Sequence, residues 1–407
     1  MSASNTSHQS DERIENGTVY DKVIFGAGPG GVLAAYKIAR LCHDVGISAR
    51  IAIVSPTIHS PAQAGTQVFN GSESSYVHGH TPEIDVIRRK GRSDLYRLIE
   101  EGQILCRFTR GLEIKAASQG ELEEFGRDIC EKNVFLPEEM SVNSDHQKMK
   151  FHAFPHSMMF GEAAQINLPA FQAELLKRFA AMGGAVIIGP RYLGQTIGPP
   201  GLRTIHTDAG DMSTSKKPLL ATGADHLLSL EELHGTGKVV YSMSVVFGPL
   251  SPEDRQRVSS GPISFAVIGA NSDLSADFPW GGIDEQGYLT CGTGDSADPD
   301  GGPAVLEEIM SFMRRHFPHI AQKYQPISTH YGAMYVTNNN EPIIGRLPHY
   351  DVLGGGGGRF LDDASAAATA YAEDLVYGTS PVLDAYERMQ PDLPFAANQT
   401  PDQPVTG

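Results

Sequence analysis

Residues 21–31 read Asp-Lys-Val-Ile-Phe-Gly-Ala-Gly-Pro-Gly-Gly, and this stretch decides the fold. The apolar run at 23–25 predicts a short strand, and the residues after the stretch predict a helix. Gly26, Gly28 and Gly31 have the spacing G-x-G-x-x-G. In a dinucleotide site the first glycine permits a tight turn, the second lets the backbone approach the pyrophosphate, and the third lets helix and strand pack closely. Strand, turn and helix in this order therefore predict a dinucleotide-binding turn.

The size and charge of the chain limit its partners. It has 407 residues and a formal net charge of −16 at pH 7. This length allows two or three domains with a large core. The negative charge argues against nucleic acid or an anionic membrane as the main partner. We therefore expect neither nucleic acid nor a membrane among its partners, and the sequence does not indicate an oligomeric state.

The chain carries no clear targeting or metal signal. Residues 1–18 are polar and lack the apolar core of a signal peptide, so we expect a disordered tail and a cytoplasmic protein. No apolar run approaches the roughly 20 residues that span a bilayer. The four cysteines are widely spaced, which predicts neither a disulfide scaffold nor a zinc site. His78 and His80 have no acidic or thiol neighbour, so we expect no metal.

A second strand at 50–54 completes a βαβ unit. The residue after such a strand is often acidic in dinucleotide folds, because a carboxylate binds the ribose hydroxyls. Here it is Ser55, followed by Pro56. A serine can still form one hydrogen bond to the cofactor, but the missing acid weakens an NAD interpretation.

Residues 58–80 are rich in Ser, Gly, Gln and His and predict a loop. Small and amide residues are concentrated at 63–67. One interpretation is a loop that crosses a planar cofactor, and the other is a plain polar surface loop. The residues alone do not choose between them.

The second half of the chain alternates between helix and strand signals. Asn167 is placed to cap a helix over 169–182, and 185–188 predicts the next strand. A hairpin region that includes 204–207 follows. Residues 218–224 then predict a strand that ends in a small-residue turn. Strand-like runs at 239–247, 263–268 and 288–291 predict an antiparallel sheet, interrupted by a helix over 304–317.

These signals predict an α/β protein, α+β overall, with a Rossmann-type dinucleotide domain and an inserted, mainly antiparallel-sheet substrate domain. The first domain is expected to be discontinuous and to comprise 19–80, 161–235 and 336–390. The second is expected to comprise 81–160 and 236–335. We expect loose tails at 1–18 and 391–407.

The order of these segments resembles the FAD-dependent amine and amino-acid oxidases, the group that includes D-amino-acid oxidase, glycine oxidase and sarcosine oxidase. The resemblance extends over most of residues 20–380. Five segments in the expected order carry it: 23–31 with its helix, 165–176, 220–224, 331–345, and the glycine run 354–358 with the helix at 361–377.

The resemblance implies non-covalently bound FAD. A glycine run directly before a helix presents bare N–H groups and the positive end of the helix dipole, which would stabilise negative charge on a reduced flavin. The alternative, a flexible linker, is disfavoured by the alanine-rich helix that follows. The resemblance implies these cofactor contacts: Gly26, Ala27, Gly28, Gly30, Gly31, Ser55, Ala64, Gly65, Thr66, Gln67, Thr222, Gly223, Gly345, Gly356, Gly357, Gly358, Arg359 and Phe360.

Three family features are missing from the sequence. Met334 stands where many members have an arginine that clamps the substrate carboxylate. Ala333 stands where sarcosine-oxidase-like members have the cysteine that links to flavin, which excludes a covalent bond at that position. The lysine that some members place over the flavin has no match in 281–290. Arg346 or Arg359 could replace the carboxylate clamp.

Amine oxidation by flavin needs placement more than acid–base help. The aromatic candidates on the inserted sheet are Tyr241, Tyr288, Tyr331 and Tyr335. We select Tyr335 as the catalytic candidate because its segment approaches the flavin in the family. His78 is a second candidate, as a proton acceptor near neutral pH. For each of them, a structural role is the competing interpretation.

Three functions follow from the sequence. The first is an FAD-dependent oxidoreductase that oxidises a C–N bond of an amine or amino-acid-like molecule by hydride transfer to flavin N5, with molecular oxygen as a possible acceptor. The second is an FAD-dependent 2-hydroxy-acid dehydrogenase, which uses a closely related fold. The third is a binding protein that keeps the fold and has lost catalysis.

Overall fold

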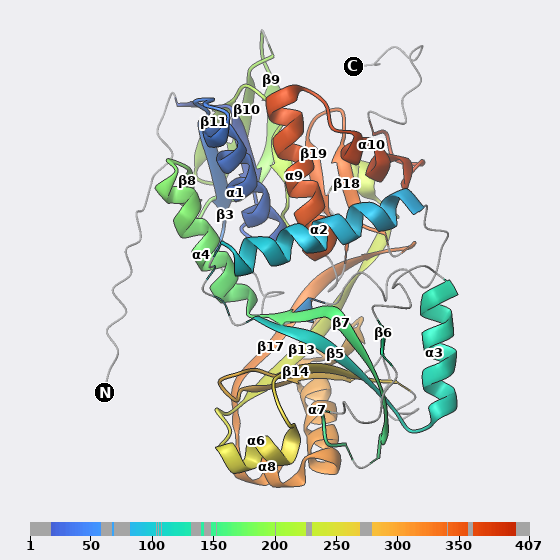
Figure 1. The fold of residues 1–407 in the computed structure, drawn as a ribbon. Helices are drawn as coiled ribbons and strands as arrows, with labels where there is room; N and C mark the ends of the chain where they lie inside the picture. Colours follow the sequence, from blue (N-terminus) through green and yellow to red (C-terminus); the bar gives the residue numbers. More distant parts are fainter. Residues whose placement is uncertain are drawn as a thin grey trace.

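The computed structural model describes residues 18–57, 67–68, 82–102, 104, 106, 108–131, 140–141, 148–151, 153–199, 201–224, 230–268, 279–339, 341–356 and 361–395. The described residues form two halves, each built on its own sheet (Figure 1). A six-stranded sheet with its helices makes the upper half in this view, and a nine-stranded sheet makes the lower half.

The six-stranded sheet has the strand order β18-β19-β12-β2-β3-β8. All its pairs are parallel except that between β18 and β19. The carboxyl ends of its five parallel strands therefore share one edge, which is where ligands bind in open α/β sheets. This confirms the predicted Rossmann-type arrangement. Its strands are β2 (Lys22–Phe25), β3 (Ile51–Ser55), β8 (Ala185–Ile188), β12 (Leu219–Leu220), β18 (Ile343–Arg346) and β19 (Asp351–Gly354).

Five helices accompany this sheet: α1 (Pro29–Asp44), α2 (Pro82–Glu100), α4 (Leu168–Ala181), α9 (Leu361–Tyr377) and α10 (Pro381–Arg388). The predicted cap of α4 is confirmed, because Asn167 Oδ1 accepts a hydrogen bond from Ala170 N at 3.0 Å. Helix α2 comes from the segment expected in the second domain, but it packs on α9.

The alanine-rich helix α9 packs against both α1 and α2. Its alanines at 364, 366–368, 370 and 372 are buried. A Cβ on Gly91 of α2 would lie 2.3 Å from Asp362 O, so this crossing needs glycine. Lys37 of α1 donates to Ser365 O at 2.7 Å and to Thr369 Oγ1 at 2.9 Å. Small residues and one lysine thus fix α9 relative to the dinucleotide turn.

The nine-stranded sheet has the order β17-β13-β16-β15-β14-β5-β7-β4, with β6 also paired to β7. Every pair is antiparallel except the parallel pair of β14 with β5. The predicted mainly antiparallel sheet is therefore confirmed. Its strands are β4 (Gln67–Val68), β5 (Phe108–Ala116), β6 (Met140–Ser141), β7 (His156–Ile166), β13 (Gly237–Phe247), β14 (Ile263–Val267), β15 (Trp280–Ile283), β16 (Leu289–Ser296) and β17 (Pro326–Thr337).

The two faces of this sheet are covered differently. Helices α6 (Pro252–Val258), α7 (Gly302–His316) and α8 (Pro318–Lys323) lie against the face that points away from the upper half (Figure 1). Met243, Val245 and Phe247 of β13 share a buried cluster with Phe312 and Met313 of α7. On the opposite face, α3 (Gln119–Glu131) covers the β5–β7 end through a cluster with Leu122.

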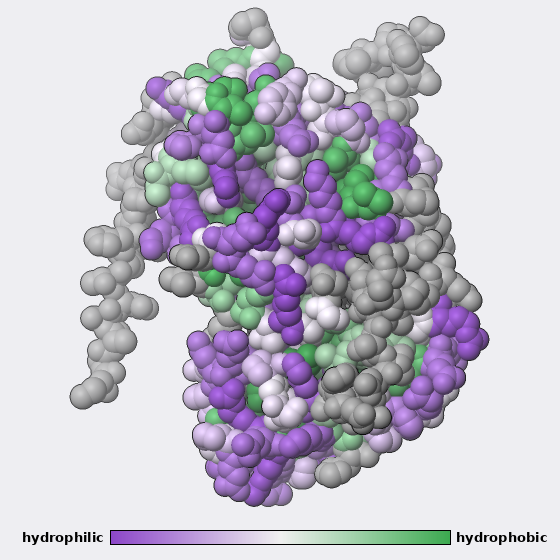
Figure 2. Space-filling model, viewed as in Figure 1, coloured by the Kyte–Doolittle hydropathy of each residue, from purple (hydrophilic) through white to green (hydrophobic). Residues whose placement is uncertain are grey.

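A third, smaller sheet has the order β1-β11-β10-β9 and confirms the predicted hairpin region. Its strands are β1 (Val19–Tyr20), β9 (Tyr192–Ile197), β10 (Arg203–Thr207) and β11 (Gly210–Thr214), and a 3-10 helix follows at η5 (Glu231–Leu233). Hydrophilic residues dominate the visible surface of both halves, with hydrophobic ones in small separate groups (Figure 2). Among the described residues, no helix is long and apolar enough to cross a membrane.

Candidate active site

The turn between β2 and α1 has room for glycine alone at two positions. Gly26 has φ +102°, and a Cβ there would lie 2.1 Å from Ala221 O. A Cβ on Gly31 would lie 1.9 Å from Gly26 O. Both distances are far below van der Waals contact with backbone atoms, so these two glycines are required by the turn itself.

Gly28 differs from both neighbours because its missing side chain faces open space. A Cβ on Gly28 would meet nothing within 4 Å. Gly28 is the N-cap of α1, no side chain caps the helix there, and the first turn holds no acidic residue. Gly30 and Gly31 are buried in that turn. In the part of the chain that the structure describes, no side chain caps the positive end of α1, as binding of an anionic diphosphate requires.

The end of β12 lies directly against this turn. A Cβ on Gly26 would lie 2.1 Å from Ala221 O, and a Cβ on Gly31 would lie 3.3 Å from Ala221 Cβ. Thr222 Oγ1 is buried and has no hydrogen-bond partner among the described residues. Gly223 follows with φ +75°. An unused hydroxyl beside an uncapped helix end fits a bound dinucleotide, which would supply the missing partner.

Two further groups line the same edge of the sheet. Gln172 of α4 donates a hydrogen bond to Ala27 O at 2.9 Å, and this bond ties the glycine turn to α4. Ser55, at the end of β3, donates to Thr57 O at 2.7 Å, and its oxygen keeps acceptor capacity. The structure thus brings Gly26, Ala27, Gly28, Gly30, Gly31, Ser55, Thr222 and Gly223 to one edge.

The remaining cofactor predictions divide into two groups. The backbone of Gln67 is described, in β4 opposite Gln165, and Gly356 forms a bridge to Val336. The other predicted cofactor contacts lie outside the described residues and stay predictions: Ala64, Gly65, Thr66, Gly357, Gly358, Arg359 and Phe360. The predicted proton acceptor His78 also lies outside them, and its catalytic role stays a prediction.

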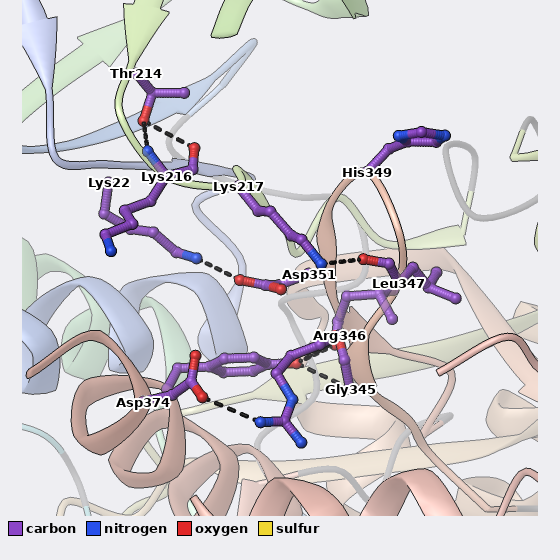
Figure 3. A network of polar contacts seen from close by, with 12 residues as sticks. Lys22, Thr214, Lys216, Lys217, Gly345, Arg346, Leu347, His349, Asp351 and Asp374 are labelled. Carbon is purple, nitrogen blue, oxygen red and sulfur yellow. Dashed lines mark hydrogen bonds and ion pairs between the residues drawn. The ribbon is translucent and has the colours of Figure 1, made fainter. Parts of the chain in front are cut away.

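Gly345 and Arg346 lie away from this edge, because β18 runs antiparallel and carries them toward its other end. A Cβ on Gly345 would lie 2.6 Å from Glu387 Cγ, which places it against α10. Arg346 donates to Glu387 Oε1 at 2.8 Å, to Asp374 Oδ1 at 3.2 Å, and also to Asp384. The contact to Asp374 is visible in Figure 3. These three carboxylates raise the pKa of Arg346 and engage its donors, which argues against Arg346 as a substrate clamp.

Tyr335 lies in the core rather than on an open surface. Its side chain is 3% exposed and packs in a cluster with Val23 and Tyr350. The hydroxyl is 2.8 Å from Thr236 Oγ1. Tyr241 and Tyr331 share this strand face, and they stack on each other 5.5 Å apart. This geometry favours a packing role for Tyr335, and its catalytic role stays a prediction.

The opposite face of the large sheet carries a different set of residues, because side chains alternate between the two faces of a strand. Of this set, sequence reasoning had considered Met334 and missed the others. The pairing register puts His330, Gly332 and Met334 of β17 on the same face as Ser242 and Ser244 of β13. This face lies opposite to the one covered by α7 and α8, and we name it the substrate face for the role that we propose for it. A signal was present in β13, where serines at 242 and 244 alternate with the apolar 243 and 245.

Across β16 and β15 the substrate face continues with Thr290, Gly292, Trp280 and Gly282. A Cβ on Gly292 would lie 2.2 Å from the Trp280 ring, so that ring lies flat over the glycine. A Cβ on Gly282 would lie 1.9 Å from Gln165 Oε1. Glycines thus let planar side chains lie on the sheet, and the face combines uncharged polar groups with apolar ones.

Behind the start of α9 lies a buried group of charges, the Arg88 cluster: Arg88, Glu341, Asp363 and Tyr386. Arg88 Nε donates to Asp363 Oδ1 at 2.9 Å, and Arg88 Nη2 donates to Glu341. Tyr386 donates to Asp363 Oδ1 at 2.7 Å. Burial, with the neighbouring Asp363, raises the pKa of Glu341 to about 7 against the opposing effect of Arg88.

This pKa predicts a pH-dependent stability. A carboxyl whose pKa is raised on folding contributes stability below its unfolded pKa, and that contribution is lost as pH rises through the folded pKa. Between about pH 4.5 and 7 we expect the ionisation of Glu341 to lower the stability of the fold by about 3 kcal/mol. Denaturant unfolding of the wild type and Glu341→Gln at pH 5, 6, 7 and 8 checks this. Equal pH slopes in both proteins would contradict it.

Comparison with known proteins identifies one family and several solved structures with a similar fold. The family model described as FAD dependent oxidoreductase matches residues 21–373. The comparison with curated proteins gave no match. Among solved structures, L-proline dehydrogenase from P. horikoshii has 14% identity and a TM-score of 0.70, covering 92% of this chain and 99% of its own. Glycine oxidase from Geobacillus kaustophilus has 16% identity and a TM-score of 0.70, covering 89% and 96%. Iminodiacetate oxidase from Chelativorans sp. BNC1 has 18% identity and a TM-score of 0.67, covering 88% and 95%.

Proposed function

The chain belongs to the FAD dependent oxidoreductase family, and on that premise we propose that it oxidises the C–N bond of a small amine or amino-acid-like molecule. Its cofactor is FAD. The single observation that carries the assignment of the cofactor site is the uncapped start of α1, where Gly28 leaves the backbone bare next to the unpartnered Thr222 hydroxyl.

Bound FAD would supply a two-electron acceptor, whose N5 takes a hydride from the carbon next to nitrogen. The chain itself supplies placement. The glycine turn and the end of β12 would hold the diphosphate. The substrate face would hold the substrate, with Trp280 and Met334 as apolar groups and Ser244 and Thr290 as uncharged polar groups.

The similar solved structures support a C–N substrate. These proteins are named for L-proline, glycine and iminodiacetate, which all carry a nitrogen bonded to an oxidisable carbon. Because identity with each is below 20%, the likeness supports a chemical class and not one compound. We assign FAD binding to the half with the six-stranded sheet and substrate binding to the large sheet, with molecular oxygen as a candidate acceptor.

Anaerobic flavin bleaching tests this function. The purified protein is expected to show a flavin spectrum, and at least one amine or amino acid in a panel should bleach it without oxygen, while 2-hydroxy acids leave it oxidised. Bleaching by hydroxy acids alone would select the hydroxy-acid dehydrogenase. Absence of FAD binding, even after titration, would select a protein that has lost catalysis.

A further inference from the structure

His330 of β17 lies on the substrate face, and the proposed function assigns it no role so far. It pairs in register with Ser244 of β13, which is 4% exposed. Met334, where many family members have the carboxylate-binding arginine, is on the same strand face. Gly332 lies between His330 and Met334, so no side chain separates them along the strand.

The imidazole of His330 has an unused buried atom. His330 Nε2 is buried, and no hydrogen-bond partner for it is found in the described part of the chain. The residue as a whole is half-buried, at the edge strand of the sheet. Burial lowers the pKa of His330, so its ring is neutral at pH 7. A buried ring nitrogen without a partner leaves a hydrogen bond unmade, which a ligand can supply.

The described residues that pair with His330 or lie next to it on this face of the sheet carry no charge. They are Ser244 on the neighbouring strand, Gly292 and Thr290 on the next one, and Gly332 and Met334 along β17. Gly332 adds no side chain between His330 and Met334, while the Trp280 ring lies over Gly292. Such a surface suits an uncharged hydrogen-bonding group better than a carboxylate, whose burial needs a cation or several donors.

We propose that His330 binds the substrate through Nε2, and that the substrate carries an uncharged hydrogen-bonding group, such as an amide or hydroxyl, on the end that lies over β17. This inference rests on the proposed C–N oxidation, since it concerns the substrate of that same site. His330 contacts the substrate, and it replaces the missing arginine in function with a neutral hydrogen bond.

Two variants and one matched control test the proposal. His330→Phe keeps an aromatic ring and removes the hydrogen bond, while His330→Gln keeps a hydrogen-bonding amide. The control is His319→Phe in α8, because His319 Nε2 is also buried without a partner in the described residues and its pKa is also lowered, but it lies in the helix layer on the other side of the sheet. All four proteins are purified with FAD and mixed anaerobically with matched pairs of an amino acid and its amide.

In the wild type, the amides are expected to reduce the flavin at lower concentration than the acids. His330→Phe should raise the KM for the amides roughly 10-fold or more with a smaller change in kcat, the size expected for one buried hydrogen bond. His330→Gln should restore part of the loss, and His319→Phe should leave KM unchanged. The wild-type KM should rise once the pH is lowered far enough to protonate His330, and His330→Phe should lack this rise.

The outcomes distinguish a failure of the proposed C–N oxidation from a failure of the proposed role of His330. If no amine, amino acid or amide bleaches the wild type, the proposed C–N oxidation fails and this inference with it. If the wild type is bleached but His330→Phe and His330→Gln both keep wild-type KM values, the inference alone is wrong. Equal losses in His330→Phe and His319→Phe, accompanied by a lower melting temperature, would also overturn it, because they would show a structural effect.

Discussion

Gly28→Ala is expected to weaken FAD binding by about 100-fold or more while leaving the fold of the apoprotein intact. The Cβ of alanine meets no protein atom within 4 Å, and the backbone at Gly28 has φ −66° and ψ 172°, which alanine adopts freely. The added methyl would instead occupy the space in front of the uncapped α1 start. Losing two charge-assisted hydrogen bonds to the diphosphate, at about 1.5–3 kcal/mol each, gives this factor or more.

Gly31→Ala provides the contrast within the same turn. Its Cβ would lie 1.9 Å from Gly26 O, so α1 must move away from β2 before any cofactor arrives. This variant should lose both FAD binding and stability. FAD titration followed by flavin fluorescence, with denaturant unfolding of each apoprotein, separates the two effects. Gly120→Ala in α3, where a Cβ also meets nothing, is the control and should change neither.

Two results would contradict the placement of FAD at this turn. One is wild-type FAD affinity in Gly28→Ala. The other is a Gly28→Ala apoprotein as unstable as the Gly31→Ala apoprotein. An N-cap change from glycine to alanine by itself costs at most about 1 kcal/mol.

The elements that the sequence predicts best are those with local signals. Residues 185–188 and 361–377 were predicted as a strand and a helix, and β8 and α9 have the same bounds. The glycines of the turn and the alanines of α9 are small, and their small size indicates that neighbouring elements pack closely against them. Such signals need only a few consecutive residues, and they therefore survive without knowledge of the tertiary fold.

The substrate face depends on information that is spread along the chain. Met334 and Tyr335 are adjacent in sequence but lie on opposite faces of β17, and only the pairing with β13, almost a hundred residues earlier, shows which face the helices cover. Sequence reasoning therefore selected Tyr335 for its chemistry and passed over His330. Arg346 illustrates the same limit, because its acidic partners at 374, 384 and 387 come from two later helices.

Lys22→Met is expected to destabilise the protein strongly while leaving FAD affinity unchanged. Lys22 of β2 and Asp351 of β19 form an ion pair of 2.5 Å across β12, with side chains only 6% exposed (Figure 3). Removing one member of a buried pair leaves the other charge unpaired, which typically costs 3–5 kcal/mol. We expect about 3 kcal/mol, because Lys217 and Arg203 still interact favourably with Asp351.

The double variant Lys22→Met with Asp351→Leu isolates the cause. It removes both charges, so most of the lost stability should return, since apolar replacements of a buried pair are often neutral. Lys22 and Asp351 each begin a parallel strand, at the sheet edge opposite to the glycine turn. FAD titration should therefore give wild-type affinity in both variants under conditions where they are folded.

Lys22→Met and Gly28→Ala thus form a reciprocal pair, one changing stability without FAD affinity and the other changing FAD affinity without stability. A Lys22→Met variant with wild-type unfolding, or a double variant no more stable than the single one, would show that the pair does not hold the sheet. Loss of FAD affinity in folded Lys22→Met would instead show that FAD does not bind at the edge of the six-stranded sheet to which we assign it.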